Sequence, residues 1–195
     1  MKILLLAYIL LIVGLTFVLP SYRIYRKTGI NPLTFSNTDS AHDFIGRLFK
    51  IIFAGLILSG AAQVLGRETA RNWLFPLSLP SWSATAGAAV LFAALAWVSI
   101  AQIHMADSWR IGIDEKNDTA LITHGLFGLS RNPIFLGMQA TLAGLFLVMP
   151  NLLTLVALAL GLALVQIQVR LEEEFLKKKH GAAYAAYCQK VRRWL

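Results

Sequence analysis

The sequence feature that most constrains the fold is a run of residues without a charged side chain, 132–169, in which apolar residues dominate. A helix that crosses a bilayer needs about 20 such residues, so this run is too long for a single span. Pro150 and Asn151 lie at its middle and are typical of a turn. We therefore predict two spans, at about 133–149 and 152–171, joined as a tight helical hairpin.

Three further apolar stretches predict membrane helices in the first half of the chain. The stretch 3–20 carries no charge and lacks the features of a cleaved signal peptide, so we expect a retained first span. A second span is expected at 51–66, and the apolar residues 44–49 lengthen it toward the N-terminus. A third span is expected to begin near Trp82, after two helix-breaking prolines. The fold class expected is an all-α integral membrane protein with about five transmembrane helices.

The overall composition supports a membrane protein and excludes several other classes. Hydrophobic residues make up 57% of the chain and charged residues 14%, whereas a soluble domain carries about 25% charged residues. The single cysteine, Cys188, excludes a disulfide scaffold, and no histidine or carboxylate spacing predicts a metal site. The net charge of +8 is explained by basic residues that flank membrane spans, so we expect no nucleic-acid partner.

Lysine and arginine are divided unequally between the two sides that five spans define. Fifteen lie in 21–50, 107–131 or the C-terminal tail, and only Lys2, Arg67 and Arg71 lie on the other side. Because basic loops stay in the cytoplasm, we predict a multi-pass protein with a cytoplasmic C-terminus. The lipid bilayer is its expected partner, and nothing in the sequence indicates an oligomeric state.

A loop and the helix start that follows it form the first of two polar segments on the cytoplasmic side. Gly125 and Gly128 allow the backbone to approach a ligand closely. Asn132 and Pro133 are typical of a helix start, with a capping side chain and a proline in the first turn. The free N–H groups of such a start can hold an anionic group. A capped helix without any ligand explains the same residues.

The second polar segment, 170–187, continues the last span as a charged helix. Glu173 with Lys177, and Glu174 with Lys178, are spaced for ion pairs one turn apart. Such pairs are also typical of a simple solvated helix face. After Gly181, apolar side chains at helical spacing predict a C-terminal amphipathic helix. These side chains are Tyr184, Tyr187, Cys188, Val191 and Leu195.

Together the two segments resemble the isoprenylcysteine carboxyl methyltransferase family of integral-membrane enzymes, which is related to the phospholipid methyltransferases. The family pattern Gly-Pro-Tyr-x-x-x-Arg-His-Pro-x-Tyr-x-Gly is similar to 125–137. Its Glu-Glu-x-x-Leu run, followed by Phe-Gly-x-x-Tyr-x-x-Tyr, is similar to 172–187, and the resemblance covers 105–195. The departures are Leu126 for proline, Asn132 for histidine and Phe135 for tyrosine.

The resemblance implies S-adenosylmethionine as cofactor and a lipophilic methyl acceptor, either an isoprenylcysteine-like carboxylate or another lipid. The implied cofactor-binding residues are His124, Gly125, Leu126, Phe127, Arg131, Asn132, Pro133, Glu172, Glu173 and Tyr184. The candidate catalytic residues are His104, His124 and Asn132. A histidine base is needed only if the acceptor is an amine or an alcohol. We expect one structural domain with two parts: 1–106, with three spans and a basic connecting loop, and 107–195, with the cofactor-binding loop, hairpin and tail.

The charge of the cofactor agrees with this assignment. Glu172 and Glu173 can pair with its cationic groups, Arg131 can pair with its carboxylate, and aromatic faces can stabilise the sulfonium. Two other functions stay open. One is a nicotinamide-dependent membrane reductase of lipophilic substrates, and the other is a non-enzymatic membrane interaction protein with a decayed site.

Overall fold

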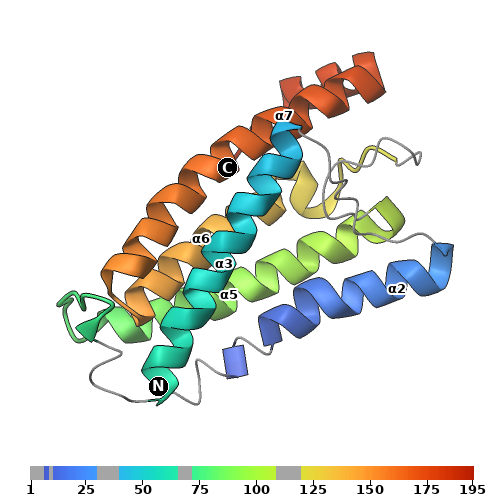
Figure 1. Cartoon of the computed structure of the whole chain (residues 1–195). Helices are drawn as coiled ribbons and strands as arrows, with labels where there is room; N and C mark the ends of the chain where they lie inside the picture. Colours follow the sequence, from blue (N-terminus) through green and yellow to red (C-terminus); the bar gives the residue numbers. More distant parts are fainter. Residues whose placement is uncertain (1–6, 9–10, 30–39, 66–71, 109–119) are drawn as a thin grey trace.

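Every regular element in the described part of the chain is a helix (Figure 1). The computed structural model describes residues 7–8, 11–29, 40–65, 72–108 and 120–195. Three helices are long and apolar enough to cross a membrane: α3 (Ala41–Leu65), α5 (Ser83–Met105) and α7 (Leu152–Lys190). These helices confirm the predicted all-α membrane fold class.

The second and third expected spans correspond to α3 and α5, and α5 begins directly after Trp82. Helix α5 packs along α6 (Pro133–Val148). Glycines face each other across this contact, and a Cβ added to Gly87 would lie 2.9 Å from the carbonyl oxygen of Gly144. Small residues let membrane helices approach closely enough to gain van der Waals contact. The α5–α6 pair is therefore in backbone contact.

The predicted hairpin is confirmed by α6 and α7, which are separated only by residues 149–151. Asn151 caps α7, since its side chain accepts a hydrogen bond from the backbone N–H of Thr154 at 3.0 Å. In return, the backbone N–H of Asn151 donates to the Thr154 hydroxyl at 3.2 Å. The Asn151 amide nitrogen also donates to the hydroxyl of Ser59 on α3 at 2.9 Å. The turn thus ties one end of the hairpin to α3.

The first expected span differs from the structure at its C-terminal end. A π-helical turn, η1 (Gly14–Val18), leads directly into α2 (Leu19–Thr28), so the helix does not end at Pro20 as expected. Pro20 lies in the first turn of α2, where its missing N–H costs little. Residues 1–6 and 9–10 lie outside the described residues. Since α6 has only 16 residues, the number of five spans stays a prediction.

Helix α7 is 39 residues long and continues well beyond the predicted span 152–171. The chain turns at Gly181, whose φ of +52° favours glycine. Beyond this kink Tyr184, Tyr187 and Val191 are buried together, as expected for the amphipathic helix. The helix ends at Lys190, so the expected place of Leu195 on its apolar stripe is wrong, and Leu195 is exposed.

Candidate functional site

The predicted site residues gather where α6 begins and α7 continues beyond its apolar part. Just before α6, the backbone N–H of Arg131 donates to the carbonyl of Arg192 at 2.9 Å. The hydroxyl of Ser130 donates to the carbonyl of Arg193 at 3.2 Å. The chain reverses direction at the kink in α7, and the segment 191–193 that follows the helix therefore lies along residues 130–132.

Glu173 is the centre of a charged cluster between α7, the start of α6 and this returning segment. Its carboxylate accepts a hydrogen bond from the Asn132 amide at 3.0 Å and lies 3.3 Å from the Arg131 guanidinium. Arg193 donates to both oxygens through Nε and Nη2, with a shortest distance of 2.8 Å. Burial raises the pKa of Glu173, but the hydrogen bonds and the two guanidinium charges outweigh it, so the pKa is lowered.

Two predictions from local spacing are wrong here. Asn132 does not cap α6 through its side chain; its amide nitrogen donates to the charged Glu173 carboxylate, and this strong hydrogen bond orients the side chain toward α7. Glu173 pairs with Arg131 and Arg193 rather than with Lys177 in the described part of the chain. Two other predictions are confirmed. Pro133 starts α6, and Glu174 pairs on the surface with Lys178 at 2.8 Å.

Glu172 lies on a different face of α7, because successive helical residues are about 100° apart. Its carboxylate accepts a hydrogen bond from the side-chain amide of Gln168 at 3.0 Å. Gln168 is buried and also lies 2.8 Å from the Nδ1 atom of His42 on α3. Burial raises the pKa of Glu172 to about 7, against the lowering effect of the Gln168 hydrogen bond. The two adjacent carboxylates thus face different elements, and their pKa values are shifted in opposite directions.

The loop before α6 is held from two sides. In the 3-10 turn η3 (Gly125–Gly128), the Leu126 N–H donates to Nδ1 of His104 at 3.2 Å. The Phe127 carbonyl accepts a hydrogen bond from the Tyr187 hydroxyl at 2.6 Å. The rings of His104 and His124 stack edge to face, with centroids 6.1 Å apart. The loop therefore joins the last turn of α5 to the helix beyond the kink.

Tyr184 and Pro133 complete the set of predicted residues. Tyr184 is buried beside the cluster, where burial and then the nearby Glu173 carboxylate raise its pKa and keep the hydroxyl protonated. Pro133 is buried, and its carbonyl accepts a hydrogen bond from the Trp97 indole at 2.9 Å. Both residues thus support the site from within the fold.

Sequence reasoning missed three polar residues of this region: Arg193, Ser130 and Gln168. Arg193 reaches Glu173 only because the chain reverses at Gly181, and no periodic pattern predicts that contact. Gln168 carried a usable signal, since a polar side chain near the end of a membrane span is a functional candidate by default.

The described part of the chain has three helices of membrane-spanning length and a charged cluster where α7 meets the start of α6, and these features define the class as an integral membrane protein. A phospholipid methyltransferase family model matches residues 82–183, more than half of the chain, and the chain belongs to this family. The family is related to the isoprenylcysteine carboxyl methyltransferases, so the resemblance seen in the sequence is confirmed. No curated protein matches the chain in sequence. The family indicates a membrane methyltransferase.

Proposed function

We propose that the chain transfers a methyl group from S-adenosylmethionine to a lipophilic acceptor at the cytoplasmic face of a membrane. The family supplies the reaction class. The observation that carries the proposal is the pair of adjacent carboxylates on α7, one locked to two arginines and the other, Glu172, held only by amide hydrogen bonding from Gln168 among the interactions described for it. This arrangement offers charges of both signs where α7 passes beyond its apolar part.

The residues present fit the charge pattern of the cofactor. When bound, the cofactor supplies an electrophilic methyl group on a sulfonium, next to an amino-acid end with an ammonium and a carboxylate. We assign the ammonium to Glu172 and the carboxylate to Arg131. The Nε atom of Arg131 is buried and has no hydrogen-bond partner among the residues that the structure describes. A buried donor without a partner costs free energy that a ligand oxygen would recover.

The remaining predicted residues are proposed to shape the pocket. Because both oxygens of Glu173 already accept from Arg193, we assign it the role of positioning Arg131 and Asn132 rather than binding the cofactor directly. The faces of Phe127 and Tyr184 would stabilise the sulfonium by cation–π attraction. The loop 124–126, with Pro133 behind it, would form one wall of the cofactor pocket.

Catalysis by this chain would consist mainly of orientation and exclusion of water. An acceptor carboxylate or thiolate needs no base, whereas an amine or alcohol must lose a proton. Nδ1 of His104 already accepts from the Leu126 N–H, so in the neutral ring the proton lies on Nε2. His104 is therefore better placed to position the loop, and the exposed His124 is the stronger candidate for a base.

Ligand binding to the purified full chain tests the proposal. Radiolabelled S-adenosylmethionine is expected to bind, and radiolabelled NADPH is not. Glu172→Gln should weaken binding about tenfold or more, which corresponds to one hydrogen bond to a charged group. Glu174→Gln is the matched control, since Glu174 is exposed and pairs with Lys178 on the surface. NADPH binding would instead support a reductase, and binding of neither ligand would support an interaction protein.

The pH dependence of binding provides a second check on Glu172. The cofactor ammonium would pair with the ionised carboxylate, whose pKa without ligand is about 7. Affinity is therefore expected to rise as the pH rises through 7, with one proton released on binding at lower pH, and to fall again where the cofactor's α-amino group loses its proton, at a pH of about 8. Glu172→Gln should abolish the rise and leave the fall, which belongs to the cofactor. An unchanged pH profile in that variant would remove Glu172 from the site.

The proposed orientation has its own test. A reporter that is active only in the cytoplasm, fused after Leu195, is expected to be active. Activity of a reporter that requires the opposite compartment would reverse the orientation, and with it the face on which the cofactor binds.

A further inference from the structure

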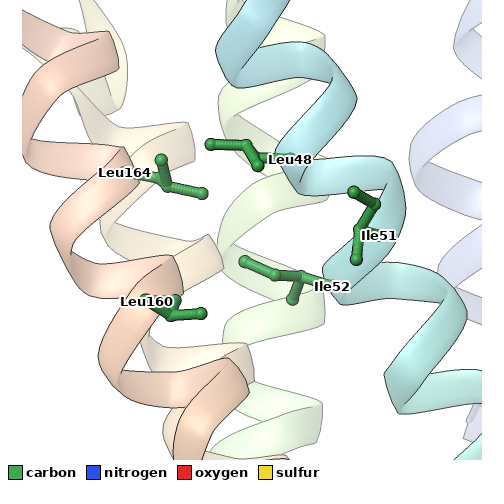
Figure 2. Close-up of a pocket in the computed structure, with 5 residues that line it drawn as sticks. All are labelled: Leu48, Ile51, Ile52, Leu160 and Leu164. Carbon is green, nitrogen blue, oxygen red and sulfur yellow. The ribbon is translucent and has the colours of Figure 1, made fainter.

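An apolar cavity of about 150 Å³ lies between α3 and α7, and the proposed site does not use it. We name it the α3–α7 crevice. It is lined by Leu48, Ile51 and Ile52 of α3 and by Leu160 and Leu164 of α7. Figure 2 shows Leu48 and Ile52 pointing across the space toward the two leucines of α7.

The crevice opens toward lipid rather than into a packed core. Ile51 is 67% exposed and Leu160 is 53% exposed, whereas Ile52 on the inner wall is buried. Both helices are long and apolar enough to cross a membrane, so the exposed side faces hydrocarbon. A cavity of about this volume lined by leucine and isoleucine excludes water and binds a small hydrocarbon. A short length of lipid chain has matching chemistry and size.

A polar bridge joins the same two helices one to two turns beyond the crevice. It consists of His42 on α3 and Gln168 and Glu172 on α7, joined by distances of 2.8 and 3.0 Å. Gln168 lies one helical turn beyond Leu164, and His42 lies fewer than two turns before Leu48. Polar groups buried at the edge of a membrane are costly and mark functional sites. Apolar walls and a polar end therefore follow one another along the same pair of helices.

We propose that the α3–α7 crevice binds one membrane lipid, with a hydrocarbon chain between the helices and the polar head at the His42–Gln168–Glu172 bridge. The inference rests on the proposed function in one respect, since this lipid would be the methyl acceptor. Glu172, which the proposed function pairs with the cofactor ammonium, would then border both sites, and the acceptor head would approach the methyl group beside it. Leu160 lies 12 residues before Glu172, or about 18 Å along the helix. This length is close to half of a hydrocarbon core of about 30 Å, so the occupant belongs to one leaflet.

Photolabelling of the full chain in vesicles tests the crevice without requiring any methyl transfer. The vesicles contain phosphatidylcholine with a small fraction of phosphatidylethanolamine that carries a diazirine on one acyl chain. Labelled peptides are mapped by mass spectrometry and are expected to concentrate at 48–52 and 160–164. Leu160→Trp fills the crevice and should reduce this labelling several-fold. Leu162→Trp is the matched control, because Leu162 is also exposed but lies about 200° away on the same helix.

Two further variants test the bridge and the fold. Gln168→Leu removes the middle of the bridge and should also lower the labelling several-fold, with Gln166→Leu as its control. Leu160→Ala enlarges the crevice and should keep the labelling. Helical circular dichroism and size-exclusion elution verify that each variant folds.

Several outcomes would overturn the inference. These are unchanged labelling in Leu160→Trp or Gln168→Leu, and labels spread evenly over lipid-facing positions such as Ile57 and Leu162. The proposed function is judged separately by cofactor binding. Specific labelling without cofactor binding would refute the proposed methyltransferase function and support the lipid site. Cofactor binding without specific labelling would refute the lipid site and support the methyltransferase function.

Discussion

The substitution Glu173→Gln tests whether the charged cluster holds the returning segment 191–193 in place. Glutamine keeps the size of the side chain and one acceptor oxygen, but it removes the negative charge that faces Arg131 and Arg193. A hydrogen bond to a charged group contributes about 1.5–3 kcal/mol. The Arg193 side chain is 35% exposed, so solvent screens its contribution, whereas the Arg131 side chain is only 12% exposed. We expect the variant to lose about 2 kcal/mol locally.

Hydrogen exchange at the Arg131 amide measures this loss, because that N–H donates to the carbonyl of Arg192 and is released when the segment opens. A loss of about 2 kcal/mol corresponds to exchange about 30 times faster. Glu174→Gln is the control, since its ion pair lies on the surface. Equal exchange rates in Glu173→Gln and the wild type would refute the reasoning, as would an equal effect in the control.

The same measurement has a defined pH dependence. The pKa of Glu173 is lowered in the folded protein, so its contribution is complete above the ordinary value of 4.5 and is lost as the pH falls through the lowered value. Exchange at Arg131, corrected for the intrinsic rate, should therefore accelerate only in acid. In Glu173→Gln it should show no such step.

Three further substitutions test how the site is supported, each by the thermal midpoint of the protein in detergent. Gly125→Ala should destabilise the fold by about 1–3 kcal/mol, since φ is +60° and the new Cβ would lie 2.5 Å from Nδ1 of His104. In Gly128→Ala the nearest atom is 3.5 Å away, and a similar loss there would contradict the steric argument. Asn151→Ala removes a cap and a buried hydrogen bond, so a loss of about 2 kcal/mol is expected, and an unchanged midpoint would show that the turn does not depend on it. Tyr187→Phe should cost about 1 kcal/mol and loosen the loop, unless the bond to the loop carbonyl contributes nothing.

The hairpin was predictable because its signals are local. The length of the uncharged run excludes a single span, and the Pro150–Asn151 pair marks a turn near its middle. The start of α5 follows from the prolines before Trp82 for the same reason. Such features depend on residues a few positions apart.

The failures lie where a partner comes from a distant part of the chain. Asn132 is a residue type that often caps helices, but Glu173, 41 residues further on, accepts a hydrogen bond from its side-chain amide instead. Glu173 pairs with Arg193 rather than with Lys177, because the reversal of the chain at Gly181 brings Arg193 close to it. Local spacing ranks only nearby partners, and a charged group brought in by tertiary structure overrides that ranking.

The direct backbone contact between Gly87 and Gly144 has a consequence for motion. Helices whose main chains touch cannot slide or separate without opening a void that no side chain can fill, so α5 and α6 should behave as one stiff body. Helix α3 is attached differently: Ile52 and Leu56 lie in the apolar core, and hydrogen bonds hold the helix through Ser59 toward one end and His42 at the other, with the crevice between these two residues. If the bundle opens to admit a long molecule from the side, α3 should therefore be the helix that moves. It would pivot about its contacts at Ser59 and His42, while α5 and α6 stay in place.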